Sequence, residues 1–272
     1  MSFIEGRGTV HFYRFAAPPA AAPRARAPLV FVNALGTDHR IWDPLIEALP
    51  PALKQRAVLC YDLRGQGLSA LGGAPHTITT LVDDLVFLLD QLELAPAVVC
   101  GLSLGGLVAQ ALAASAPERV AALCLCATGL EIGAPQLWTE RIAVVRSRGL
   151  GELTSAIIER WFSPGFRREQ PGLARGYQTL LERNTPEGYI ASLEVLRDTD
   201  LSAQAAHVRA PALVIAGESD VATPPVRVQR LAAALSRSRY GTLTGAGHLF
   251  PIEQPEAVAE ALAGFIEELG NV

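Results

Sequence analysis

The sequence is short of cysteine and carries no excess of positive charge. Its 4 cysteines among 272 residues are too few for a disulfide-stabilised scaffold. The 23 Lys and Arg residues are outnumbered by 27 Asp and Glu, and the formal net charge of −4 argues against a surface for nucleic acid or anionic membrane. The N-terminal segment MSFIEGRGTVHFYRF has no apolar core of signal-peptide length, so we predict a cytoplasmic protein.

Signatures of metal and nucleotide cofactors are also missing. The sequence has no HExxH motif and no CxxC spacing, and its histidines stand singly. It has neither a G-x-G-x-x-G motif after a strand nor a P-loop lysine. We therefore expect no metal and no cofactor. Since free cysteines in apolar runs usually pack in the interior, we interpret all of them as buried residues: Cys60, Cys100, Cys124 and Cys126.

The hydrophobic pattern predicts the fold class. Hydrophobic residues make up 50% of the chain, which excludes disorder because enough surface can be buried to offset the ordering entropy. Short, continuous apolar runs alternate with segments of helical period, as in a parallel sheet covered on both faces. We predict an α/β fold with a mostly parallel, doubly wound sheet and right-handed crossovers. The expected strands are Leu29–Val32, Ala57–Tyr61, Ala97–Cys100, Val120–Cys126, Ala212–Ala216 and Arg239–Leu243.

Two helices and one insertion complete this outline. Apolar residues at helical spacing predict a helix from Ile78 to Leu92 with Thr77 as its N-cap, and a final helix that begins at Pro255. Residues 131–200 show helical patterns without a convincing buried strand. A helical insertion between two strands would lie over the strand ends as a lid. We predict an α/β core of residues 1–130 and 201–272 and a lid, or cap, of residues 131–200.

The uncharged stretch from Ala95 to Pro117 has two interpretations. It is long enough to span a bilayer, and its Gly101-x-x-x-Gly105 spacing resembles a helix-dimerisation motif. However, Ser103 and other polar residues dilute it, and β-branched residues gather at one end while alanines gather at the other. A strand, a glycine-rich turn and a helix explain this asymmetry better, so we expect no membrane association.

That same turn carries the first candidate catalytic residue. Gly101-Leu102-Ser103-Leu104-Gly105 matches G-x-S-x-G between a strand-like run and a helix. The tight turn requires glycine at the flanking positions and holds the Ser103 hydroxyl clear of the backbone. The helix that follows directs N–H groups and its positive dipole end at developing negative charge. The context predicts Ser103 as a nucleophile.

A serine hydroxyl needs a base to accept its proton, and on this fold an acid and then a histidine follow the serine along the chain. His248 follows the expected strand Arg239–Leu243 in a glycine-containing loop, and we predict it as the base. Glu218 and Asp220 both follow the preceding strand. We favour Asp220 because it lies further past the strand end, where it would stabilise the imidazolium of His248.

Two backbone N–H groups are expected to form an oxyanion hole. One belongs to Leu104, the residue after the nucleophile, and the other to Leu35 in the loop after the first predicted strand. Two interpretations are open for His39 and Trp42, just beyond this loop: they line the pocket, or they serve only in packing. Further along the chain, we interpret Asp62 and Arg64 as structural residues that bind loop backbone.

Segments along nearly the whole chain carry a more specific resemblance. They are Phe31–Asp38, Trp42–Pro44, Tyr61–Gly65, Gly101–Gly106, Glu159–Phe162, Thr185–Tyr189, Leu196–Leu201, Val221–Pro225 and Ile252–Glu256. In these segments the chain resembles the α/β-hydrolase superfamily, and within it the 3-oxoadipate enol-lactonases of the β-ketoadipate pathway of aromatic catabolism. Three positions depart from that pattern: Ala34 and Gln66 stand where Ser and His are expected, and Phe250-Pro251 replaces a small polar pair.

The resemblance implies a small-molecule substrate, a five-membered enol-lactone with one carboxylate, opened through an acyl-enzyme. The carboxylate needs a cation, for which Arg141 and Arg160 are candidates, with solvated surface charge as the alternative for each. Trp138 and Trp161 would form apolar walls. Rival interpretations are a carboxylesterase or cofactor-free perhydrolase (haloperoxidase) of the same fold and, less favoured, a non-catalytic receptor or scaffold. The sequence does not indicate the oligomeric state.

Overall fold

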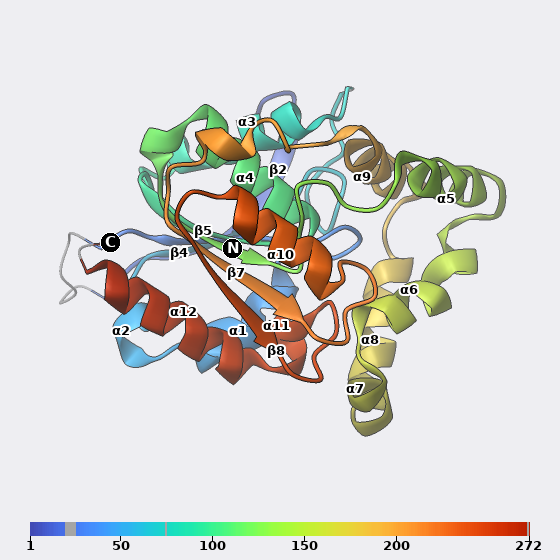
Figure 1. Ribbon diagram of the computed structural model, residues 1–272. Helices are drawn as coiled ribbons and strands as arrows, with labels where there is room; N and C mark the ends of the chain where they lie inside the picture. Colours follow the sequence, from blue (N-terminus) through green and yellow to red (C-terminus); the bar gives the residue numbers. More distant parts are fainter. Residues whose placement is uncertain (20–25, 74, 271) are drawn as a thin grey trace.

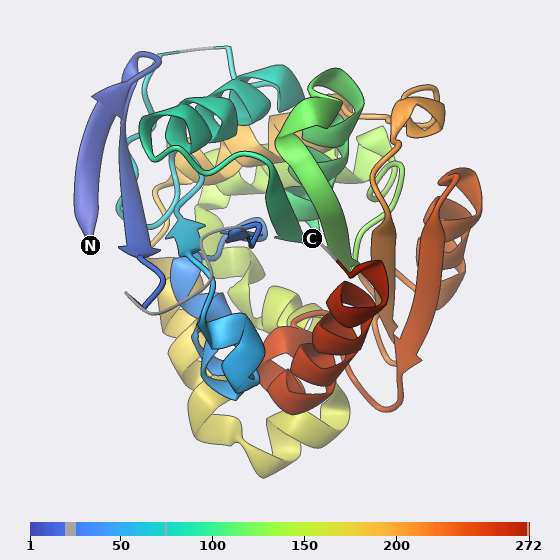
Figure 2. The same cartoon turned by 90° about the vertical axis from the view of Figure 1, so that its left-hand side faces the viewer.

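The computed structural model describes residues 1–19, 26–73, 75–270 and 272, and a twisted sheet organises them. Its strands, in the spatial order β1-β2-β4-β3-β5-β6-β7-β8, are parallel from β4 to β8, while β2 pairs antiparallel with both β1 and β4. Figure 2 shows the β1–β2 hairpin at one edge and β8 at the other. The bounds are β1 (Ser2–Gly6), β2 (Thr9–Ala16), β3 (Leu29–Val32), β4 (Val58–Tyr61), β5 (Ala97–Leu102), β6 (Val120–Cys126), β7 (Ala212–Gly217) and β8 (Ser238–Leu243).

Helices cover both faces of this sheet, which confirms the predicted α/β class. Strands β3, β4 and β5 are buried along their whole length, as their continuous apolar runs predict. Figure 1 shows α3 (Ile78–Gln91), α4 (Leu104–Ser115) and α10 (Pro225–Ala234) on one face. The other face carries α1 (Asp43–Ala48), α2 (Pro51–Lys54), α11 (Phe250–Glu253) and α12 (Pro255–Leu269).

Local signals account for where the predicted helices begin. The Thr77 hydroxyl accepts a hydrogen bond from the Thr80 N–H and caps α3, as its sequence position predicts. Pro255 is the first residue of α12, where its missing N–H costs nothing. The stretch from Ala95 to Pro117 contains β5, a turn and α4, and no described helix is long and apolar enough to cross a membrane.

The N-terminal hairpin was absent from our sequence-based outline. Strands β1 and β2 are joined by a tight turn in which Arg7 and Gly8 both have positive φ, at 54° and 73°. Gly6, Arg7 and Gly8 separate two short segments rich in β-branched and aromatic residues, which is a hairpin signal. Both strands add to the sheet beyond β4, at the edge opposite β8.

Between β6 and β7 the chain leaves the sheet as a helical insertion, residues 131–200. Figure 1 shows this insertion gathered at one side of the sheet. Its neck is closed by a hydrogen bond of 2.8 Å from the Leu201 N–H to the Leu130 carbonyl. Its helices are α5 (Pro135–Arg148), α6 (Thr154–Trp161), α7 (Pro164–Glu169), α8 (Pro171–Glu182) and α9 (Pro186–Asp198).

All four cysteines are buried and free. Cys124 and Cys126 share one face of β6, and their sulfur atoms lie 3.8 Å apart. Burial raises the pKa of the Cys60 thiol to about 12, so that side chain is a neutral packing group. These features agree with the packing interpretation drawn from the apolar runs.

Candidate active site

Ser103 occupies the sharp turn between β5 and α4. Its backbone lies at φ 54° and ψ −113°, a strained conformation for a residue with a side chain. Two hydrogen bonds hold it there: the Ser103 N–H donates to the Cys126 carbonyl at 2.9 Å, and the Thr128 hydroxyl donates to the Ser103 carbonyl at 2.8 Å. The backbone N–H and carbonyl groups of Ser103 are thereby anchored, while its side chain lines a pocket.

The glycines of the motif are required by close backbone contacts. A Cβ atom on Gly101 would lie 2.3 Å from the carbonyl oxygen of Gly105. A Cβ atom on Gly105 would lie 2.2 Å from the carbonyl oxygen of Val32 in β3. Any side chain at either position would therefore separate the strand from the helix, which is the physical basis of the G-x-S-x-G spacing.

His248 and Asp220 meet although they come from different strand ends. His248 Nδ1 and Asp220 Oδ2 are 2.8 Å apart, and both side chains are buried. The other carboxylate oxygen, Oδ1, accepts hydrogen bonds from the Ala222 N–H at 2.7 Å and the Thr223 N–H at 3.0 Å. Because Asp220 accepts at Nδ1, the Nε2 atom of His248 is left to act on a substrate or a nucleophile.

Thr223 is a site residue that the sequence reasoning missed. Its buried hydroxyl donates to Asp220 Oδ2 at 2.6 Å. Burial alone would raise the pKa of Asp220, but the charge of His248 and the hydrogen bonds from His248 and Thr223 outweigh it and leave the pKa below its ordinary value. The one available signal was the spacing of three residues between the acid and a hydroxyl-bearing side chain.

Glu218, the competing acid of the sequence analysis, lies elsewhere. Its side chain is exposed and accepts a hydrogen bond from the Gly245 N–H at 2.8 Å. Within the described residues, the carboxylate that contacts His248 is that of Asp220.

Ser103 and His248 line one narrow pocket of about 40 Å³. No hydrogen bond joins the Ser103 hydroxyl to His248 among the described residues, and such contacts often tighten only when substrate binds. The insertion and the loop after β3 complete the lining. The other lining residues are Ala34, Leu35, Ile132, Trp138, Arg141, Ile157, Arg160, Trp161, Tyr189, Leu196 and Ala222.

In the loop after β3, the N–H group of Leu35 is available to a ligand. Gly36 N–H donates to Gln66 Oε1 at 2.7 Å, and Thr37 N–H donates to the Ala34 carbonyl at 3.2 Å. Among the hydrogen bonds of the described residues, none uses the N–H of Leu35. The N–H of Leu104, at the start of α4, has no acceptor within its own helix. These two groups are the ones that the sequence nominates for an oxyanion hole.

Two cations face the pocket without a carboxylate partner. Neither Arg141 nor Arg160 takes part in an ion pair within the part of the chain that the structure describes. The Arg141 guanidinium lies 5.1 Å from the centre of the Trp138 ring. Burial, and then the charge of Arg141, lower the pKa of Arg160, because a second positive charge in a partly dry site is unfavourable. An anion in this pocket would relieve that repulsion.

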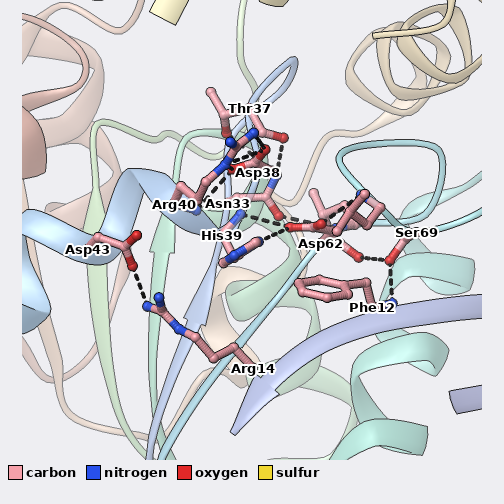
Figure 3. A network of polar contacts seen from close by, with 12 residues as sticks. Phe12, Arg14, Asn33, Thr37, Asp38, His39, Arg40, Asp43, Asp62 and Ser69 are labelled. Carbon is pink, nitrogen blue, oxygen red and sulfur yellow. Dashed lines mark hydrogen bonds and ion pairs between the residues drawn. The ribbon is translucent and has the colours of Figure 1, made fainter. Parts of the chain in front are cut away.

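A polar network around Asp62 supports the neighbouring loops. Figure 3 shows His39 directed at Asp62, whose Oδ1 lies 2.8 Å from both the backbone nitrogen and Nδ1 of His39. Asp62 Oδ2 accepts a hydrogen bond from the Leu68 N–H at 2.8 Å, and Asp38 pairs with Arg40 at 2.6 Å. Asp38, His39 and Asp62 are near enough to share a metal ion, but the carboxylate oxygens of Asp38 and Asp62 already accept hydrogen bonds from protein donors.

The remaining candidates also have structural contacts. Arg64 forms a buried, two-pronged ion pair with Asp84 of α3, as the structural interpretation requires. Trp42 is fully buried against Phe31, with ring centres 5.1 Å apart. Neither His39 nor Trp42 is among the described residues that line the Ser103 pocket. Of the two interpretations, pocket lining and packing, the structure therefore favours packing and loop support for both residues.

Comparisons with known proteins agree on one family. The Alpha/beta hydrolase family matches residues 29–261. The chain is 35% identical over 237 residues to 3-oxoadipate enol-lactonase 2 of Acinetobacter baylyi, covering 87% of each chain. It is 31% identical to a putative non-heme bromoperoxidase, BpoC, of Mycobacterium tuberculosis, covering 88% of this chain and 93% of that one. The crystal structure of the enol-lactonase from Burkholderia xenovorans LB400 superposes with a TM-score of 0.91 at 33% identity, covering 98% and 100% of the two chains.

Proposed function

Because this chain belongs to the α/β-hydrolase family and is an ester-hydrolysing enzyme, we propose that it opens a small enol-lactone bearing one carboxylate, 3-oxoadipate enol-lactone, to 3-oxoadipate. The observation that carries the proposal is that Arg141 and Arg160, which have no carboxylate partner among the described residues, line the pocket that holds Ser103 and His248. A neutral ester would leave both charges without a counter-ion. A cytoplasmic location and a place in aromatic catabolism belong to the same proposal.

The reaction begins at the lactone carbonyl. Ser103 Oγ attacks this carbon while its proton passes to His248 Nε2, and Asp220 stabilises the resulting imidazolium. The N–H groups of Leu35 and Leu104 hold the oxyanion. The ring C–O bond then breaks, its oxygen takes the proton from His248, and the released enol becomes a ketone that stays attached to the acyl-enzyme.

Water completes the cycle. His248 accepts a proton from a water molecule that attacks the acyl carbon, and then returns that proton to Ser103 as the ester bond breaks. The products are free enzyme and the open dicarboxylate. This sequence needs no metal ion and no redox group, because both steps are acyl transfers.

The substrate carboxylate is held by the insertion, which thereby acts as a lid. Arg160 and Arg141 offer planar, charged donors, and Trp138 and Trp161 supply the apolar walls around the ring. The free volume of about 40 Å³ is far below the roughly 300–1,000 Å³ of ordinary ligand pockets. We therefore expect side chains of the insertion to move outward when the lactone binds.

The test compares an anionic with a neutral substrate. We expect wild-type enzyme to show a higher kcat/KM for the enol-lactone than for p-nitrophenyl acetate. Arg160→Leu should raise KM for the lactone about 10- to 100-fold, the value of a charge-assisted hydrogen bond, and leave the neutral ester unchanged. Arg175→Leu, which removes an exposed arginine from α8, is the matched control.

Three results would contradict the proposal. A clear preference for the neutral ester would favour the carboxylesterase or perhydrolase alternative, for which the bromoperoxidase relative provides support. Ser103→Ala that keeps a tenth of the wild-type rate would exclude this serine as the nucleophile. Failure of the wild-type protein to react with a fluorophosphonate would favour a non-catalytic role.

A further inference from the structure

Gly36 lies in direct contact with the helical insertion. It follows Leu35 in the loop after β3 and has a positive φ of 74°. A Cβ atom there would lie 2.8 Å from Leu181 Cδ1 and 2.9 Å from Tyr189 Cε2, both side chains of the insertion. The loop that carries the Leu35 N–H is thus pressed against α8 and α9 rather than facing solvent.

Two carboxamide side chains hold Gly36 from opposite directions. The buried Gln66 accepts the Gly36 N–H at its Oε1, at 2.7 Å. Asn184, between α8 and α9, donates from Nδ2 to the Gly36 carbonyl at 3.0 Å. Because a backbone N–H can only donate, the orientation of the Gln66 carboxamide is fixed. Its Nε2 then lies 3.3 Å from the Ser192 hydroxyl of α9.

These contacts bear on the direction of the Leu35 N–H. The Gly36 N–H that Gln66 accepts belongs to the peptide plane directly after Leu35, and this bond restrains rotation at Leu35. On the other side of Leu35, Thr37 donates from its N–H and its hydroxyl to the Ala34 carbonyl, which shares a peptide plane with the Leu35 N–H. With the planes on both sides fixed, the Leu35 N–H has one direction available to it.

We propose that Gln66 and Asn184 are positioning residues of the oxyanion hole, whose carboxamides hold Gly36 so that the Leu35 N–H is aimed at the developing negative charge. The inference rests on the proposed serine-hydrolase function. It also makes the oxyanion hole depend on the insertion, because Asn184 belongs to the insertion and Gln66 contacts Ser192 within it. The hole is complete only when α8 and α9 are seated on the loop.

The experiment separates transition-state stabilisation from substrate binding. We expect Gln66→Met and Asn184→Ala each to lower kcat about 10- to 100-fold while KM stays within about twofold, since a misdirected donor costs less than the loss of one, 10²- to 10³-fold. Affinity for phenylboronic acid, which forms a tetrahedral adduct on Ser103, should fall in parallel. Gln66→His should retain activity, because neutral imidazole offers one acceptor and one donor.

The matched control is Gln178→Met. The Gln178 carboxamide lies on the surface of α8 and donates to Glu182 at 2.9 Å, away from the loop. This variant should keep the wild-type kcat, KM and boronate affinity. Thermal unfolding of all variants shows whether each is folded. If Gln66→Met does not fold, kcat and boronate affinity of Asn184→Ala, at a half-buried position, test the inference alone.

Two outcomes would overturn the inference. One is an unchanged kcat in folded Gln66→Met or Asn184→Ala. The other is a lower kcat with unchanged boronate affinity, which would indicate general damage rather than a misdirected donor. A wild-type protein that hydrolyses no ester or lactone contradicts the proposed function instead, and the rate of fluorophosphonate labelling of Ser103 then compares the same variants without any substrate.

Discussion

The Asp220 carboxylate accepts more hydrogen bonds than a solvent-exposed carboxylate would need to stay ionised. Ala222 and Thr223 donate to it from the backbone, and the Thr223 hydroxyl shares Oδ2 with His248. A carboxylate taken out of water needs such donors to stay ionised. In the proposed mechanism an ionised Asp220 stabilises the imidazolium of His248, so we expect the Thr223 hydroxyl to support catalysis without touching the substrate.

We expect Thr223→Val to lower kcat about tenfold and the free energy of unfolding by about 1–3 kcal/mol, because one charge-assisted hydrogen bond is lost from a buried site. The pKa of Asp220 should rise toward its ordinary value. The loss of activity that follows protonation of Asp220 should therefore begin at a higher pH than in wild type. The measurements are kcat against pH and urea unfolding at neutral pH.

Thr242→Val in β8 is the control for that substitution. The Thr242 hydroxyl donates to the Tyr240 hydroxyl on the exposed face of β8, at 2.7 Å. Its loss should leave kcat and its pH dependence as in wild type. An equal effect of both substitutions would show that Thr223 acts only through general stability.

The sequence predicted some site residues and not others for a physical reason. Ser103 could be predicted because the turn that carries it requires glycines at fixed positions. His248 and Asp220 could be predicted because the carboxyl ends of parallel strands meet at one edge of the sheet. Gln66 and Asn184 carry no such pattern. Their importance depends on contacts between segments far apart in the chain, and in the sequence Gln66 stood out only as a departure from a family pattern.

At the scale of elements, β5 and α4 approach so closely that the turn at Ser103 tolerates no Cβ atom on its flanking glycines. Gly105→Ala should lower the free energy of unfolding by about 1–3 kcal/mol or more, since the new Cβ atom would meet backbone rather than a movable side chain. Gly176→Ala, in the interior of α8 with no atom near its Cβ position, should raise it by about 1 kcal/mol. Thermal unfolding checks that Gly105→Ala is less stable than wild type and that Gly176→Ala is more stable.

The same elements show where a sequence pattern is informative. The continuous apolar runs identified β3, β4, β5, β6 and β7, and the strand-like segment before the His248 loop identified β8, with bounds displaced by two residues at most. The hairpin of β1 and β2 escaped because it lies at the edge and buries only part of its side chains. Partial burial weakens the hydrophobic signal by which β3 to β7 were recognised.

At the scale of the whole molecule, a buried histidine links the hairpin to α3. His11 of β2 is fully buried, with Nε2 3.2 Å from the Gly6 carbonyl and 3.7 Å from Asp84 of α3. Burial lowers the pKa of His11 more than the charge of Asp84 raises it, and Arg64 lowers it further. The folded protein therefore keeps His11 neutral where the unfolded chain, with an ordinary pKa of about 6.5, begins to take up a proton.

Stability should consequently fall as the pH drops below about 6.5, because the unfolded state then binds more protons than the folded state. We expect the urea midpoint of wild type to be lower at pH 5 than at pH 7. His11→Phe should flatten that difference, whereas His207→Gln, which alters an exposed histidine, should leave it as in wild type. A His11→Phe variant with the full wild-type pH dependence would contradict this assignment.

The neck of the insertion has a consequence for how this architecture diversifies. Leu130 and Leu201 are joined by one backbone hydrogen bond, and β6 and β7, on either side, are neighbours in the sheet. A loop of any length that starts and finishes at that junction leaves the strand register untouched, and longer loops add little closure entropy. Recombination at this single junction can thus exchange the whole insertion while the sheet beneath it keeps its strand pairing.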